Sequence, residues 1–175
     1  MSLRTINAGY SLVTTLLALA HAISLAIWML SKGAVPMPPK VLPWVLTIMA
    51  GIHAILSVVI MITTHKGQQK KGNSYPKLNR ETIVQRITGV LMLLFTALHI
   101  LGTVGIMQPP QFVHAVVPPL FFFIVLAHTA ISTSKALITL GIGSWKFIRV
   151  ATIAVKLVCA TTLIADVVGF YLFVC

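Results

Sequence analysis

Long apolar stretches separated by short polar connectors run through almost the whole chain. Five of them reach the length of about 20 residues that a helix needs to cross a bilayer. They cover approximately residues 8–30, 41–64, 87–107, 112–134 and 150–174. Because little polypeptide remains between them, the pattern predicts an all-α fold. We expect residues 1–175 to form a single domain, an integral membrane bundle of five transmembrane helices.

The composition excludes a soluble globular protein, since 58% of the residues are hydrophobic and 9% are charged, with a mean hydropathy of +0.99. The connectors are too short to hold a soluble catalytic domain, so chemistry on a water-soluble substrate would belong to a partner. Arg4, the apolar run after it and Ala20-His21-Ala22 have some features of a cleavable signal peptide. The run continues to Leu30, however, which favours a membrane span.

The positive charges indicate an orientation. If the N-terminus is cytoplasmic, the outer connectors carry only Lys32 and Lys40, and the inner segments carry Arg4, Lys66, Lys70, Lys71, Lys77, Arg80, Arg86, Lys135, Lys146 and Arg149. This asymmetry predicts a cytoplasmic N-terminus and an external C-terminus in the cell inner (cytoplasmic) membrane. The net charge of +11 does not indicate nucleic acid as a partner, because no aromatic residues alternate with the basic runs. The inner basic face would suit anionic lipid or a docked cytoplasmic partner.

Four histidines lie deep in four different apolar stretches: His21, His53, His99 and His128. An ionisable side chain at such depth is a functional candidate by default. A single transmembrane histidine is as often an interhelical hydrogen-bonding residue as a metal ligand. One histidine on each of four helices is the pattern needed to hold two hemes, each between two imidazoles.

The depths of these histidines suggest how they pair. At about 1.5 Å per residue, His21 and His99 lie roughly 20 and 18 Å from the inner ends of their spans. His53 and His128 lie roughly 16 and 9 Å from the inner side, a looser match. Pro118 and Pro119 can bend the fourth span and shift His128. We therefore expect His21 to pair with His99 toward the outer side, and His53 with His128 toward the inner side.

The other candidate ligands are weaker. His65 lies among lysines at the inner edge and is expected to be solvated. His114, at the outer start of span four, could bond to solvent, a headgroup or a quinone. It lies nearly on the helical face of His128 and so is also an alternative ligand. The only cysteines, Cys159 and Cys175, both belong to the last span and form no paired metal motif.

Two segments carry a resemblance to a known family. The first is Gln85-Arg86-Ile87-Thr88-Gly89, followed by an apolar run to His99. The second is His53-Ala54, which leads through an apolar helix into the polar loop before that motif. Together they resemble the five-helix diheme cytochrome b subunit of succinate:menaquinone oxidoreductases and fumarate reductases. The resemblance covers almost the whole chain, with histidines on spans one to four and none on span five.

The resemblance implies a function and a ligand set. His21 and His99 would ligate the iron of an outer (distal) heme b, and His53 and His128 that of an inner (proximal) heme b. The family's diheme subunit is the membrane anchor of a succinate dehydrogenase or fumarate reductase. It passes electrons between an iron–sulfur subunit and membrane quinone, here expected to be menaquinone or another quinone. The iron–sulfur and flavoprotein subunits would dock on the cytoplasmic side, and this chain would not itself act on the dicarboxylate.

Several polar residues have two interpretations. Arg86 would meet a propionate of the proximal heme, or is an ordinary anchor at the inner edge. Asp166 and His114 are candidates for a quinone site, although Asp166 could be merely interfacial. Lys156 could reach toward the inner interface or touch a propionate, and it lies about 80° from Asp166 around the helix. Four basic residues would either dock the iron–sulfur partner or only orient the chain in the membrane: Lys70, Lys71, Lys77 and Arg80.

Two other functions remain open from the sequence. One is a different diheme membrane cytochrome that exchanges electrons with ascorbate or a hydrogenase partner. The other is a small transporter that uses its histidines as a proton relay without heme. Transporters often contain internal repeats with broken helices, and no convincing repeat is present here. Absorbance distinguishes the two classes, since only a heme protein is coloured.

Overall fold

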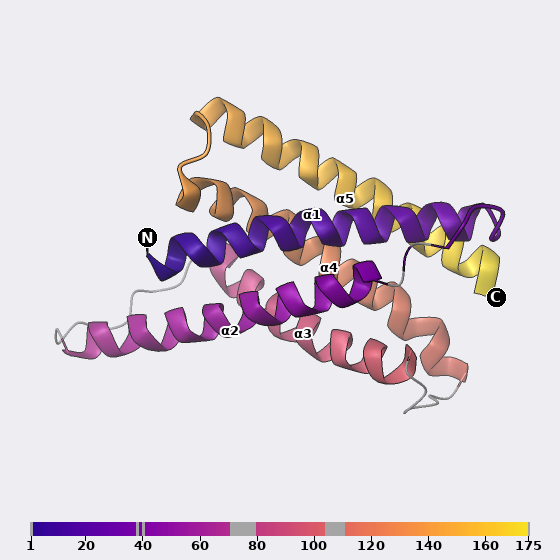
Figure 1. Cartoon of the computed structure of the whole chain (residues 1–175), viewed down its shortest axis with the longest axis horizontal. Coiled ribbons are helices and arrows are strands. Elements are labelled where there is room, and N and C mark those ends of the chain that lie inside the picture. Colours follow the sequence, from indigo (N-terminus) through magenta and orange to yellow (C-terminus); the bar gives the residue numbers. More distant parts are fainter. Residues whose placement is uncertain (1, 38, 40, 71–79, 104–110, 175) are drawn as a thin grey trace.

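The chain forms five long helices in a computed structural model that describes residues 2–37, 39, 41–70, 80–103 and 111–174 (Figure 1). The helices are α1 (Leu3–Leu30), α2 (Val41–Lys70), α3 (Arg80–Thr103), α4 (Gln111–Leu140) and α5 (Trp145–Val174). Each is long and apolar enough to cross a membrane, and no strand is present among the described residues. For the described residues, the prediction of an all-helical fold with five helices long and apolar enough to cross a membrane is confirmed. The last residues of the third predicted span, 104–107, lie outside the described residues.

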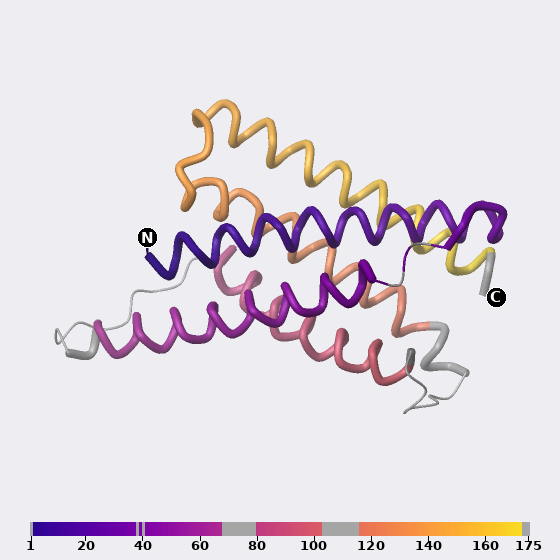
Figure 2. The backbone as a smooth tube through the Cα atoms, viewed as in Figure 1, coloured from indigo at the N-terminus to yellow at the C-terminus, as the bar shows by residue number. Residues whose placement is uncertain are grey.

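Successive helices run in opposite directions along the bundle, and the two termini lie at opposite ends (Figure 2). We call one end the basic end: it holds the N-terminus, the end of α2, the start of α3, the end of α4 and the start of α5. The basic residues of the described segments there include Arg4, Lys66, Arg80, Lys146 and Arg149. The cytoplasmic location of this end stays a prediction.

The helix ends differ in places from the predicted ones, for identifiable reasons. Helix α1 begins at Leu3 because the Ser2 hydroxyl accepts a hydrogen bond from the Thr5 amide at 3.2 Å. Helix α4 continues to Leu140, well past the expected end of the span near residue 134. It ends in a Schellman turn with Gly141 at a φ of +67°, a conformation that glycine adopts without strain.

The core of the bundle lies between α1, α4 and α5, which pack against one another. Small and hydroxyl side chains dominate the buried stripes, which lets the backbones approach closely. The buried residues include Ala8, Ser11, Thr15, Ala18 and Ala26 on α1, Thr129, Ser132, Thr133 and Ala136 on α4, and Cys159 and Thr162 on α5. Helix α4 remains continuous through Pro118 and Pro119.

Helices α2 and α3 flank this core, α2 on α1 and α3 on α4. The diagonal pairs α1/α3 and α2/α4 are not among the packed pairs in the described part of the chain. No described side chain of α2 or α3 is buried, and large apolar residues such as Ile48, Ile55 and Val90 are exposed on them. Exposed apolar faces of this kind suit lipid contact. Because the helices of each diagonal pair do not pack on each other, space remains in the middle of the bundle.

Candidate functional site

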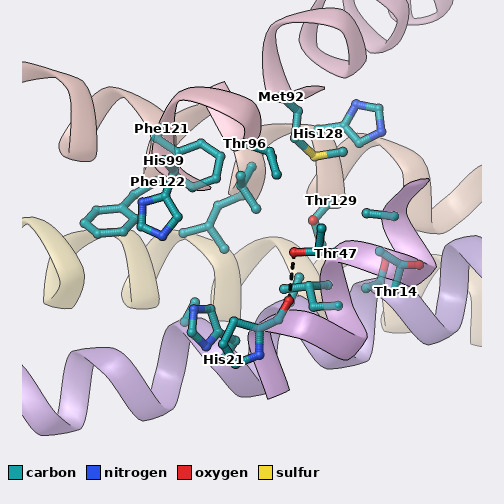
Figure 3. Close-up of a pocket in the computed structure, with 18 of the residues that line it drawn as sticks. Thr14, His21, Thr47, Met92, Thr96, His99, Phe121, Phe122, His128 and Thr129 are labelled. Atoms are coloured by element: carbon teal, nitrogen blue, oxygen red, sulfur yellow. Dashed lines mark hydrogen bonds between the residues drawn. The ribbon is translucent and has the colours of Figure 1, made fainter. Parts of the chain in front are cut away.

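All four span histidines line a single cavity of about 520 Å³ in the middle of the bundle. His21 comes from α1, His53 from α2, His99 from α3 and His128 from α4, while α5 contributes Asp166. The walls are mainly apolar, with hydroxyls at Ser11, Thr14, Thr15, Thr47, Thr96, Thr129 and Ser132. The volume falls within the range of about 300–1,000 Å³ that small-molecule and cofactor pockets occupy. Figure 3 shows how side chains of several helices converge on this space.

Electrostatic interaction links the imidazoles across the diagonals of the bundle. His21 interacts electrostatically with His99, and His53 interacts with His128. Figure 3 shows His21 across the cavity from His99 and its neighbours Phe121 and Phe122. The pairing of these histidines as ligands stays a prediction. Among the described residues no group of three histidine, cysteine or acidic side chains could hold a metal ion.

The two pairs lie at different levels of the bundle. The Asn7 carbonyl lies against the His53 ring, and His21 follows Asn7 on α1 by 14 residues, or about 21 Å at the helical rise. On α3, Thr88 contacts His128, and His99 follows Thr88 by 11 residues, or about 16 Å. Both helices therefore place the His53–His128 pair nearer the basic end.

A hydroxyl on α3 orients the His128 ring. Thr88 Oγ1 lies 3.0 Å from His128 Nδ1 and 2.9 Å from the Val84 carbonyl oxygen. The hydroxyl hydrogen is within reach of the Val84 and Gln85 carbonyls of its own helix. When it is donated there, the hydroxyl oxygen accepts from the Nδ1–H tautomer of His128, and Nε2 keeps a lone pair. Ligating histidines commonly donate their other N–H to such a partner.

The rest of the Gln85–Gly89 segment also serves the contact between α3 and α4. A Cβ atom on Gly89 would lie 3.2 Å from His128 Cε1, so any larger residue would require the ring or α3 to shift by a few tenths of an ångström. The Lys135 ammonium donates to Gln85 Oε1 at 2.8 Å and to Thr82 Oγ1 at 3.0 Å. The motif that carries the family resemblance is therefore the segment that surrounds the α4 histidine.

The other histidines have different surroundings. His99 packs on Phe121, with ring centroids 5.3 Å apart, and it is exposed where the other three are half-buried. The Nδ1 atoms of His21 and His53 are buried and have no hydrogen-bond partner among the described residues. An unpaired polar atom in an apolar cavity costs free energy unless a water or another group binds it.

Asp166 is completely buried, with 0% of its surface exposed, and it lines the cavity from α5. Neither carboxylate oxygen has a hydrogen-bond partner among the described residues. One turn further on, a Cβ on Gly169 would lie 2.9 Å from Met29 Cβ, which shows how closely α5 approaches α1 here. Asp166 is therefore enclosed by the helices and faces the cavity, and whether it lies at the depth of the membrane interface stays a prediction.

The remaining predicted residues lie away from the cavity. Arg86 is exposed and is not among the cavity residues, although its charge acts on Lys135. Lys156 lies in a separate pocket on another face of α4, so the structure does not bring it to the histidines. His65 is exposed near the end of α2. Helix α4 includes His114, but its side chain lies outside the described residues, as do the side chain of Lys70 and all of Lys71 and Lys77.

Sequence reasoning missed Lys135 and the role of Thr88. Lys135 was assigned to a connector, yet it is part of α4 and links that helix to α3. A signal was present, since Lys135 follows His128 by seven residues and therefore lies on nearly the same helical face two turns away. Thr88 could not be recognised, because its partner is 40 residues away in the chain.

Comparisons with known proteins do not identify the chain: no family model, no curated protein and no solved structure matches it.

Proposed function

We propose that this protein is the membrane-anchor cytochrome b subunit of a succinate dehydrogenase or fumarate reductase complex. It would bind two b hemes and pass electrons between an iron–sulfur subunit and membrane quinone, most simply menaquinone. The observation that carries the proposal is the arrangement of four histidines from four helices around one cavity.

The residues present fit two such groups. His21 and His99 would hold one heme iron, and His53 and His128 the other, nearer the basic end. Hemes bound there would supply one-electron exchange, which the side chains of this chain cannot perform. Thr88 would orient His128 so that Nε2 is directed to a ligand. The absence of a side chain at Gly89 leaves space for the His128 ring. Arg86, outside the cavity, stays the candidate partner of a proximal heme propionate, and Lys135 on α4 is a second cation near the inner pair.

Because the two histidine pairs lie at different levels, hemes held by them would form a path for electrons along the bundle. The inner pair lies toward the basic end, whose positive charge suits a docked iron–sulfur subunit, with the flavoprotein beyond it. The outer pair lies on the side of Asp166, whose buried carboxyl could give or accept a proton at a quinone site. His114, at the start of α4, is a second candidate for that site. Oxidation or reduction of the dicarboxylate would take place on the flavoprotein.

The decisive measurement is a redox-titrated, dithionite-reduced minus oxidised spectrum of the purified protein, with pyridine hemochrome quantitation. We expect two b hemes per chain with separate midpoint potentials. Copurification of an iron–sulfur protein and a flavoprotein, with succinate or fumarate activity, would distinguish this complex from other diheme cytochromes. A colourless protein prepared from heme-replete cells would contradict the proposal. The histidines and Asp166 would then be better explained as a proton relay.

A further inference from the structure

A second pocket, of about 220 Å³, lies between α3, α4 and α5 near the basic end of the bundle. Its walls are Arg80, Glu81 and Val84 of α3, Ala130, Ile131 and Ser134 of α4, and Lys156 of α5. The histidine cavity uses other residues of α4, namely His128, Thr129 and Ser132 in the same stretch. The second pocket is therefore a separate feature, on another face of α4.

Among the residues that the structure describes, the two cations of the pocket have no protein partner. Arg80 and Lys156 are exposed, and neither makes a hydrogen bond or an ion pair with the residues that the structure describes. The only acid of the pocket, Glu81, interacts electrostatically with Lys135. Arg80 is also the first residue of the 24-residue helix α3, where the helix dipole adds positive potential. An ionisable residue within a span normally has a partner or lines a functional site, so Lys156 requires a counter-charge.

The depth of the pocket indicates where that counter-charge lies. Ser134 precedes the end of α4 by six residues, or about 9 Å, and Lys156 follows the start of α5 by eleven residues, or about 16 Å. The pocket thus lies one to three turns inside the basic end, a depth at which headgroups would meet acyl chains if the helix ends mark the membrane surface. A lysine side chain at this depth can extend its ammonium toward the headgroups. Val84, Ala130 and Ile131 form apolar walls beside the two cations.

We propose that this pocket binds the phosphate headgroup of an anionic phospholipid such as phosphatidylglycerol. The Arg80 guanidinium and the Lys156 ammonium bind the phosphate, and the Ser134 hydroxyl donates a further hydrogen bond. Val84, Ala130 and Ile131 contact the upper part of the acyl chains. Basic pockets between transmembrane helices on the cytoplasmic side are typical sites for acidic headgroups. The apolar walls favour a lipid over free phosphate, and the inference does not depend on heme binding.

The test uses the full chain purified in detergent, with thermal unfolding followed as lipid is added. Phosphatidylglycerol should raise the Tm in a saturable way, whereas phosphatidylcholine and inorganic phosphate should not. Arg80→Gln and Lys156→Gln should each raise the half-saturating concentration of phosphatidylglycerol by about fivefold, the contribution of one basic residue near an anionic surface. Lys146→Gln is the matched control, because it removes one exposed charge from α5 outside the pocket.

Native mass spectrometry gives a second readout that does not depend on Tm. The unsubstituted chain and Lys146→Gln should retain one phosphatidylglycerol molecule under conditions where Lys156→Gln loses it. Equal retention of phosphatidylcholine, or an equal effect of Lys146→Gln on the half-saturating concentration, would overturn the proposal. An equal effect of inorganic phosphate would show a free-anion site and would overturn it as well.

Discussion

Thr88 on α3 holds the imidazole of His128 on α4, with 3.0 Å between Thr88 Oγ1 and His128 Nδ1. With its own hydrogen donated to the backbone of α3, the hydroxyl accepts from the Nδ1–H tautomer of His128, which leaves Nε2 as an acceptor. The contact thus restrains the orientation of a cavity histidine. The contact joins the Gln85–Gly89 segment of α3 to His128 of α4, a member of the inner histidine pair.

Replacing Thr88 with valine keeps the shape of the side chain and removes this acceptor. Loss of a partner to a ligating histidine typically lowers metal affinity by about 10- to 100-fold, so we expect one of the two hemes to be partly lost or shifted in potential. Pyridine hemochrome quantitation with redox titration measures both effects. Thr161→Val is the control, because the exposed Thr161 hydroxyl also bonds to its own helix but contacts no imidazole. Equal effects of the two variants would contradict this role of Thr88.

Gly89→Ala tests the close approach of α3 to His128. The added methyl would lie 3.2 Å from Cε1 of the ring, so the imidazole or the helix must move. Strain from added methyl groups in a packed site costs about 1–3 kcal/mol, and we expect lower thermal stability together with altered inner-heme absorbance. Gly51→Ala adds the same methyl where nothing lies within 4 Å, and it should stabilise α2 by about 0.5–1 kcal/mol. A Gly89→Ala protein as stable as Gly51→Ala, with an unchanged spectrum, would show that the approach is unimportant.

Alanine substitutions of the four histidines test the pairing. His53→Ala and His128→Ala should remove the same spectral component, and His21→Ala and His99→Ala should remove the other. Within each pair the double variant should lose no more heme than the single ones, because the two ligands act as a unit. His65→Ala, in the exposed end of α2, serves as the control. If His53→Ala and His21→Ala removed one shared component, the pairing would be wrong.

Asp166→Leu separates the stability of the fold from its function. A buried polar group without hydrogen bonds costs about 1–3 kcal/mol, so leucine should raise the free energy of unfolding in detergent. If the carboxyl serves quinone chemistry, the same variant should lose quinol oxidation while both hemes remain. Asp166→Asn retains a buried polar group and should show little gain in stability. A leucine variant less stable than the unsubstituted protein would mean that the carboxylate has a structural partner.

Much of the fold could be predicted from the sequence because membrane spans have a strong local signal. Lipid permits only elements that satisfy their own backbone hydrogen bonds, so the five apolar stretches had to be helices. Helix ends were less predictable. The end of α4 depends on a turn at Gly141, and a hydropathy pattern does not detect such a turn. The predicted span therefore ended too early, and Lys135 fell into the predicted connector although it belongs to the helix.

The candidate site divides in the same way. The number of histidines, their distribution over four helices and their approximate depths follow from the sequence and the helical rise of about 1.5 Å per residue. Their convergence on one cavity, and the exposure of His99 compared with the other three, required the packing of the helices. Arg86 and Lys156 show the limit of the sequence argument, since both have suitable charge and depth but lie outside the histidine cavity.

The sequence by itself determined five membrane-spanning helices and one deep histidine on each of the first four, because hydrophobic length and helical rise act locally along the chain. Only the tertiary structure decided which groups meet: Thr88 with His128, Gln85 with Lys135, and Asp166 with the interior of the bundle. These contacts join residues far apart in the chain. Their geometry depends on how small residues let α1, α4 and α5 pack closely while α2 and α3 stand apart across the cavity.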